Sequence, residues 1–166
     1  MKLLTVSDVT KTYGSIKALQ GVGVEINAPG IVGLVGPNGA GKTTLIKSIL
    51  GLTNVNSGSI KLFGHDWKDV SLRKKIAYLP EKFNFYPYYT VQQTLAFFGA
   101  MRNLESSHIE RDILKSLELL KITELLKRKL STLSKGQLQR VGLASLIIGE
   151  ADFFIVLEGS NVQIPI

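Results

Sequence analysis

Gly36-Pro-Asn-Gly-Ala-Gly-Lys-Thr-Thr44 has the spacing G-x-x-x-x-G-K-[ST] of a phosphate-binding loop. It follows the apolar run Ile31-Val-Gly-Leu-Val35, which predicts a buried strand, and precedes Leu45–Leu50, whose spacing predicts a helix. In this setting successive backbone N–H groups and the helix N-terminus bind phosphate oxygens. An ordinary glycine turn with an incidental lysine is the alternative, which the strand and helix on either side disfavour. The sequence therefore predicts an α/β nucleotide-binding protein.

The residue types in this loop indicate how it would bind a nucleotide. Lys42 would reach the β- and γ-phosphates, and the Thr43 hydroxyl would bind Mg²⁺. The glycines would let the backbone turn its N–H groups toward the phosphates. The expected nucleotide-binding residues are Gly36, Pro37, Asn38, Gly39, Ala40, Gly41, Lys42, Thr43 and Thr44.

The composition is that of a globular protein of about one domain. The chain has 166 residues, of which 45% are hydrophobic, and no apolar run approaches the roughly 18 residues that span a bilayer. It has no cysteine and no signal-peptide pattern, so a cytosolic location is the simplest interpretation. The net charge is +7, but the basic residues form only small clusters, at 73–75 and 127–129, and we expect most of them to be solvated.

Apolar periodicity predicts strands and helices along the whole chain. Expected strands are Leu3–Val9, Val22–Ile26, Ser59–Phe63, Ile76–Leu79 and Phe153–Leu157. Expected helices are Val91–Met101, Ile109–Leu120, Thr123–Leu130 and Ser134–Ile148. This order indicates an α/β core at residues 1–90 and 150–166, which would bind the nucleotide through its phosphate loop, with a helical subdomain at about 91–149 inserted into it.

A second motif, Leu133-Ser-Lys-Gly-Gln137, precedes the last expected helix. Ser134 is suited to cap that helix, and Gly136 permits the close approach of a phosphate. An ordinary N-cap is the alternative. The motif resembles the LSGGQ signature of ATP-binding cassette (ABC) ATPases, and its place downstream of a phosphate loop and a helical block makes the resemblance specific.

The resemblance covers nearly the whole chain and implies a P-loop NTPase core sheet with an N-terminal antiparallel β element and an inserted helical subdomain. It also implies ATP and Mg²⁺ as ligands, with Ser134, Gly136 and Gln137 meeting the γ-phosphate held by another subunit. The expected partners are a second cassette, in a head-to-tail homodimer or heterodimer, and a transmembrane permease subunit. Nucleic acid is not expected, and the location would be the cytoplasmic face of the membrane.

Three further features match the family. Tyr13 would stack on adenine, or else pack at a strand end. Glu81 stands where the family's Q-loop has glutamine, so it would be catalytic and a Mg²⁺ ligand, or else a solvated loop residue. The aromatic stretch Phe83–Tyr89 would meet the membrane partner, or else pack within the helical block. The forms of Tyr78-Leu-Pro-Glu81 and of the turn Thr53–Gly58 resemble bacterial ABC-type exporters.

The sequence departs from the family after the last expected strand. In the preferred register Leu157 replaces the aspartate that holds the Mg²⁺ shell, and Glu158 remains as the catalytic base. In a shifted register Glu158 is the metal-side acid and the base is missing. Asp152 is expected at the opposite end of the strand. Because the sequence stops at Ile166, before the family's switch histidine, a truncated or degenerate cassette, a shortened product and a sequence error stay open.

The sequence is compatible with several functions. The main one is the ATP-binding subunit of an ABC transporter, which couples ATP hydrolysis to substrate movement by a membrane partner. The alternatives are a cassette that binds nucleotide but is impaired in hydrolysis, and a soluble ABC-type ATPase. A small-molecule kinase or GTPase would leave the Leu133–Gln137 motif unexplained, and the guanine motif Asn-Lys-x-Asp is missing.

Overall fold

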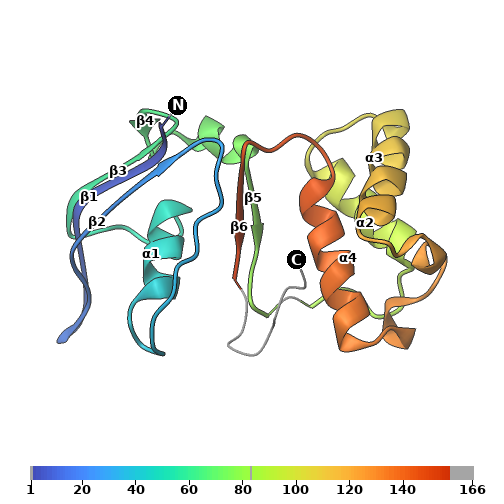
Figure 1. Ribbon diagram of the computed structural model, residues 1–166, viewed down its shortest axis with the longest axis horizontal. Coiled ribbons are helices and arrows are strands. Elements are labelled where there is room, and N and C mark those ends of the chain that lie inside the picture. The colour runs from blue at the N-terminus through green and yellow to red at the C-terminus, as the bar shows by residue number, and fades with distance from the viewer. Residues whose placement is uncertain (1, 83, 158–166) are drawn as a thin grey trace. The chain divides into compact units, whose positions relative to one another are not determined.

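A computed structural model describes residues 2–82 and 84–157 (Figure 1). The chain forms two compact units, Met1–Arg73 and Lys74–Ile166. Each unit is described by itself. The first contains the phosphate loop, and the second contains the helical block and the Leu133–Gln137 motif.

The first unit is built on a four-stranded antiparallel sheet with the order β2-β1-β3-β4. Strands β1 (Lys2–Tyr13) and β2 (Ile16–Asn27) form a long hairpin, and β3 (Ser57–Leu62) and β4 (His65–Asp66) complete the sheet. The hairpin turns at Gly14, whose φ of +56° is open to glycine at no steric cost. The three strands expected in this region are therefore confirmed, and the first two are longer than predicted.

Helix α1 (Lys42–Ile49) follows the phosphate loop and lies against β2. Its apolar positions Leu45, Ile46 and Ile49 are buried, which is the spacing of one helix face. They belong to the same unit as the buried side chains of β1 and β3 and as Trp67, which is only 6% exposed. The helix predicted from this spacing is confirmed.

The segment Ile31–Val35 is not the buried strand that its apolar run predicts. It has no strand assignment, and Ile31 and Val35 are fully or almost fully exposed. A strand exists only through hydrogen bonds to a neighbouring strand, and within residues 2–82 and 84–157 no strand pairs with this segment. The prediction was wrong because apolar content reports a tendency to be buried, whereas strand formation needs a partner.

The second unit contains a pair of parallel strands, β5 (Ile76–Leu79) and β6 (Phe153–Val156). Their register places Tyr78 opposite Ile155 and Leu79 opposite Val156. Both strands were expected, although β6 ends one residue earlier than predicted. Helix α4 (Lys135–Ile147) packs on β5, where Leu146 forms one buried cluster with Ala77 and Leu79.

Helices α2 (Val91–Met101), α3 (Ser106–Leu119) and α4 enclose the core of the helical block (Figure 1). Fully or nearly fully buried members of this core include Val91, Leu95, Ile113, Leu117, Val141 and Ala144. At Gly99 an added Cβ would lie 2.6 Å from Ile109, so the glycine permits α2 and α3 to approach closely. The three corresponding helices are confirmed, and none of the described helices is long and apolar enough to cross a membrane.

The helix predicted at Thr123–Leu130 is replaced by two short 3₁₀ turns, Thr123–Leu125 and Leu130–Thr132. The carbonyls of Leu126 and Arg128 accept hydrogen bonds from the backbone at the start of α2 rather than from their own segment. Leu125 and Leu130 are nevertheless buried. The apolar spacing therefore predicted which residues enter the core, but this tertiary pairing competes with the helical hydrogen bonds.

Candidate nucleotide-binding site

The phosphate loop is a tight turn that leads directly into α1. The Ala40 amide donates to the Pro37 carbonyl at 3.2 Å, and the Leu45 amide donates to the Gly41 carbonyl at 2.8 Å as the first helical bond. Gly39 and Gly41 have φ values of +83° and +86°, in the left-handed region that side chains with a Cβ disfavour. The backbone therefore takes a conformation that favours glycine at positions 39 and 41.

Gly41 is also required by its surroundings. A Cβ built on it would lie 2.3 Å from the Ala18 carbonyl oxygen of β2. This contact would be with backbone, which cannot move aside as a flexible side chain can. The loop is thus held against β2, so that the antiparallel sheet fixes the position of the start of α1.

The Lys42 ammonium lies across the loop. Its Nζ donates to the carbonyls of Gly36 at 2.6 Å and of Pro37 at 2.9 Å. An ammonium has three donors, so one remains for a phosphate oxygen in this arrangement. The first turn of α1 has no acidic residue to neutralise the partial positive charge of the helix N-terminus. Thr43 is exposed in this turn, where its hydroxyl is open to a ligand.

Tyr13 lies at the end of β1, close to the same part of β2. It pairs with Ile16, two residues before the Ala18 that contacts the loop. Tyr13 is 46% exposed as a residue, and its hydroxyl lies 3.3 Å from the Thr53 Oγ1. The Lys11 Nζ lies 4.9 Å from the ring centroid in a cation–π contact. Lys11 thus covers one face of the Tyr13 ring.

Lys11 belongs to none of the sequence motifs, although the chain carries a signal for its place beside Tyr13. Residues two apart on a strand project from the same face, so Lys11 and Tyr13 are expected to be neighbours once β1 is assigned. The contact between Ala18 and Gly41 had no comparable signal. It depends on how β2 packs against the loop, which the spacing of residues does not encode.

The Leu133–Gln137 motif forms the start of α4 in the second unit. The Ser134 Oγ accepts from the Gln137 amide at 3.3 Å, and the Ser134 amide donates to the Gln137 Oε1 at 2.9 Å. This reciprocal capping box confirms the predicted N-cap. Nothing lies within 4 Å of a Cβ built on Gly136, so this face of the helix start is open. The Ser134 hydroxyl proton and the unpaired N–H groups of the first turn remain available to an anion.

The carboxyl ends of β5 and β6 lie side by side in the second unit. The Leu157 amide donates to the Leu79 carbonyl at 2.9 Å, which extends the parallel pairing by one residue. Glu81 follows β5 by two residues and is exposed. Glu81 and Leu157 therefore belong to the same edge, but leucine offers no side-chain oxygen for a metal shell. Glu158 lies outside the described residues.

The opposite end of β6 is occupied by Asp152. Its carboxylate lies 3.6 Å from the Lys75 Nζ, and its amide donates to the Lys75 carbonyl at 2.9 Å. This confirms that Asp152 lies away from the edge of Glu81 and Leu157. Within the described ranges no group of three His, Cys, Asp or Glu side chains could hold a metal ion. Of the residues expected to hold Mg²⁺, Thr43 lies in the first unit and Glu81 in the second, and each offers one oxygen-bearing side chain within its own unit.

The aromatic stretch after Pro80 divides into two parts. Phe85 packs against the helical core and meets Phe98 edge-on, with ring centroids 6.0 Å apart. Tyr86, Tyr88 and Tyr89 are exposed, by 68%, 75% and 45%. Packing within the helical block is therefore confirmed for Phe85, contact of the exposed tyrosines with a membrane partner stays a prediction, and Phe83 lies outside the described residues.

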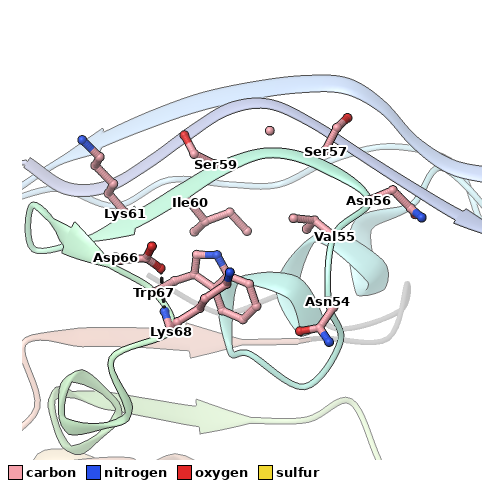
Figure 2. Close-up of a pocket in the computed structure, with 11 residues that line it drawn as sticks. Asn54, Val55, Asn56, Ser57, Ser59, Ile60, Lys61, Asp66, Trp67 and Lys68 are labelled. Carbon is pink, nitrogen blue, oxygen red and sulfur yellow. Dashed lines mark hydrogen bonds between the residues drawn. The ribbon is translucent and has the colours of Figure 1, made fainter.

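A separate hollow of about 470 Å³ lies beside β3 in the first unit (Figure 2). Its buried lining is Ile60 and Trp67, while Asn54, Lys61 and Lys68 stand exposed around it. Asp66 accepts from the Lys68 amide at 2.9 Å, so this carboxylate is used in a local turn. The hollow includes none of the residues of the phosphate loop, and it contributes no group to that site.

The phosphate loop and Tyr13 belong to the first unit, whereas Glu81, Ser134, Gly136 and Gln137 belong to the second. Each group is assembled within its own unit. The first offers backbone N–H groups, a lysine and a hydroxyl, which suit the phosphates and metal of a nucleotide. The second offers an open helix start, which suits an anion.

Proteins of known family are similar to this chain in sequence. Residues 19–160 match the ABC transporter family. The lactose transport ATP-binding protein LacK of Rhizobium radiobacter is 33% identical over 93% of this chain and 43% of its own length. An uncharacterized ABC transporter ATP-binding protein of Bacillus subtilis, YhaQ, is 34% identical over 94% of this chain and 52% of its own length. The chain thus spans about half the length of the curated relatives it matches.

The fold agrees with a solved structure as well. The ATP-binding subunit of an ABC transporter superposes with a TM-score of 0.79 and 29% identity, over 93% of this chain and 65% of that one. The motifs, the fold and the match over most of the sequence lead to one conclusion: the chain belongs to the ABC transporter family of ATP-binding proteins.

Proposed function

We propose that this chain is the ATP-binding subunit of an ABC transporter, in which ATP binding and hydrolysis are coupled to substrate movement by a membrane partner. The observation that carries the proposal is the phosphate loop, with left-handed glycines at 39 and 41 and Lys42 folded across it. The open helix start at Gly136 supports a second contact to the same nucleotide. The family of the chain agrees with both.

In this proposal two cassettes pair head to tail. The loop Gly36–Thr44 of one subunit and Ser134–Gln137 of the other would hold one ATP between them, with Mg²⁺ at Thr43. Ser134 would donate its hydroxyl proton to the γ-phosphate, and its capping bond from Gln137 keeps the Oγ in place for that contact. Glu81 would bind the metal or the attacking water, and Glu158 would act as base. Tyr13 would stack on adenine with the ring face opposite Lys11.

The partner in the membrane would be a permease, and the chain would lie at the cytoplasmic face of the membrane. The tyrosines at 86, 88 and 89 are exposed within their unit, which supports a surface that a protein partner would cover. The relatives carry different cargo in their names, lactose among them, and the cargo of this chain would be selected by its permease.

A second candidate is a cassette that binds ATP but is impaired in hydrolysis. Leu157 favours it, because this residue lies at the carboxyl edge beside Glu81 and has no oxygen to hold the Mg²⁺ shell. In this candidate, ATP binding persists while turnover falls well below the ordinary enzyme range of about 1–10³ s⁻¹.

Calorimetric titration with ATP, with and without Mg²⁺, tests the first proposal on the purified chain and on Lys42→Ala. Removing the ammonium should weaken ATP binding at least tenfold, because a charge-assisted bond to phosphate contributes about 1.5–3 kcal/mol. Lys47→Ala, on the same helix, is the matched control and should bind as the unaltered chain does. If Lys42→Ala binds ATP with the same affinity as the unaltered chain, the loop is not the ATP-binding site.

Phosphate release in the same samples separates the two candidates. Turnover near or above about 1 s⁻¹ supports the hydrolysing subunit, whereas tight binding with turnover far below that rate supports the impaired cassette. The permease partner is tested separately, by whether the chain co-purifies with a membrane protein. Recovery with ribosomes or DNA instead would favour the soluble ABC-type ATPase.

A further inference from the structure

The Tyr13 side chain is held at two points by residues that have no assigned part in nucleotide binding. The Lys11 Nζ lies over the ring, 4.9 Å from its centroid. At the tip of the side chain, the Tyr13 hydroxyl lies within hydrogen-bond distance of the Thr53 Oγ1, at 3.3 Å. A contact on the ring face and a contact at the tip together restrict rotation about both side-chain torsions. The ring is therefore held in one orientation although Tyr13 is exposed.

Thr53 is itself fixed, because the segment that carries it is bound along β1. The Asn56 Oδ1 accepts from the Thr12 amide, and the Asn56 amide donates to the Thr10 carbonyl, both at 2.8 Å. These two bonds reach the residues on either side of Lys11. Lys11 and Thr53 are thus tied to the same stretch of β1 as the ring that they contact.

The segment that carries Thr53 also leads directly out of α1, the helix of the phosphate loop. The Leu52 amide donates to the Lys47 carbonyl in the last turn of α1, at 2.8 Å. At the other end of this helix, Gly41 lies so close to the Ala18 carbonyl of β2 that no Cβ would fit. The ring and the phosphate loop are therefore joined by short paths within one compact unit. Such a fixed spacing suits a ligand that is bound at both ends, by a base and by phosphates.

We propose that Lys11 and Thr53 are positioning residues, which set the Tyr13 ring for stacking against the nucleobase. The inference rests on the proposed function, in which this ring binds adenine. Ordering a side chain on binding costs affinity, so a base that meets a ring already in place binds more tightly. Lys11 and Thr53 therefore determine how strongly the site prefers a nucleotide to an inorganic polyphosphate, which has no base to stack.

The test is calorimetric titration of the purified chain and its variants with ATP and with inorganic tripolyphosphate, both in the presence of Mg²⁺. Tyr13→Ala should lower the affinity for ATP about 5- to 150-fold, the range found for base–aromatic stacking, and leave that for tripolyphosphate unchanged. Lys11→Met and Thr53→Val should each weaken ATP binding about two- to fivefold, because a cation–π contact or a hydrogen bond to the ring is lost. Neither substitution should alter the binding of tripolyphosphate.

Three further variants separate a role through the ring from a general effect of charge or stability. Lys11→Arg keeps a cation over the ring and should restore ATP binding. Lys61→Met removes the same charge from an exposed position on β3 and should bind both ligands as the unaltered chain does. In a Tyr13→Ala chain, Lys11→Met should have no further effect on ATP binding. Urea unfolding followed by Trp67 fluorescence checks that each variant keeps its fold.

The proposal is overturned if Lys11→Met weakens tripolyphosphate binding as much as ATP binding, because the lysine would then act on the phosphates through its charge. It is also overturned if Lys11→Met still weakens ATP binding in the Tyr13→Ala chain, or if the variants at Tyr13, Lys11 and Thr53 bind ATP as the unaltered chain does. Lys42→Ala, which should weaken both ligands, keeps the two proposals apart. Its expected loss without any effect at Lys11 and Thr53 rejects the positioning residues alone, whereas an unaltered chain that binds neither ligand rejects the proposed function.

Discussion

Gly41→Ala is expected to damage the phosphate loop more than the same change at Gly39, although both glycines are left-handed. At Gly39, where φ is +83°, nothing lies within 4 Å of the added Cβ. At Gly41, where φ is +86°, the added Cβ would lie 2.3 Å from the Ala18 carbonyl oxygen. The backbone conformation is thus matched between the two sites, and the close approach to β2 is the difference.

The expected losses of unfolding free energy follow from the backbone conformation and from the close approach to β2. A left-handed alanine costs roughly 1–2 kcal/mol, and this applies to both variants. Forcing extra atoms into a packed site adds about 1–3 kcal/mol, and this applies at Gly41 only. Gly41→Ala should therefore lose about 2–5 kcal/mol of unfolding free energy, against about 1–2 for Gly39→Ala. The start of α1 must also shift, so ATP affinity should fall further in the Gly41 variant.

Urea unfolding followed by tryptophan fluorescence measures these differences, because Trp67 is the single tryptophan of the chain and is buried in the unit that holds the loop. Calorimetric titration with ATP gives the accompanying affinity. Equal destabilisation by the two alanines would show that the loop does not lie against β2, and the structural argument would then be rejected.

Three further predictions concern the second unit. Leu157→Asp should strengthen Mg²⁺-dependent ATP binding, because it adds a carboxylate at the edge with Glu81, whereas Leu157→Ala should not; an equal response of the two, by titration with and without Mg²⁺, contradicts the assigned position. Gly136→Ala should raise helix stability by up to about 1 kcal/mol, yet weaken ATP-dependent self-association in sedimentation, and unchanged association would separate Gly136 from the nucleotide. Burial raises the pKa of Tyr78 above its ordinary value, so the folded state favours the neutral phenol and stability should fall as pH rises through about 10 and above. Tyr78→Phe should remove that part of the loss in urea unfolding between about pH 9 and pH 11, and an identical pH dependence would show that Tyr78 does not cause it.

Local signals in the sequence predicted most of the elements. The spacing of Leu45, Ile46 and Ile49 predicted α1, and Ser134 with Gln137 predicted where α4 begins. These succeeded because the interactions that decide them lie within four residues of each other. The failures at Ile31–Val35 and Thr123–Leu130 have the opposite cause. In both, the outcome depends on hydrogen-bond partners far along the chain.

The candidate site shows the same division. The residues of the phosphate loop could be named from spacing, because backbone nests and helix starts are local structures. The carboxyl edge could not be named in this way, because Glu81 and Leu157 come to the same edge only when β5 and β6 pair. The antiparallel bridge between Thr90 and Lys129 is a second example, since these two residues lie about forty positions apart along the chain.

By itself the sequence determined that this chain holds a phosphate loop and an ABC-type signature, since each motif depends on a few adjacent residues. Only the tertiary structure decided why Gly41 must be glycine, because the carbonyl it meets belongs to β2. It also decided which aromatic side chains of the stretch after Pro80 are buried and which are exposed, because burial is a property of the packed unit. Adjacent residues determine the chemistry that is offered, and packing determines which groups can act together.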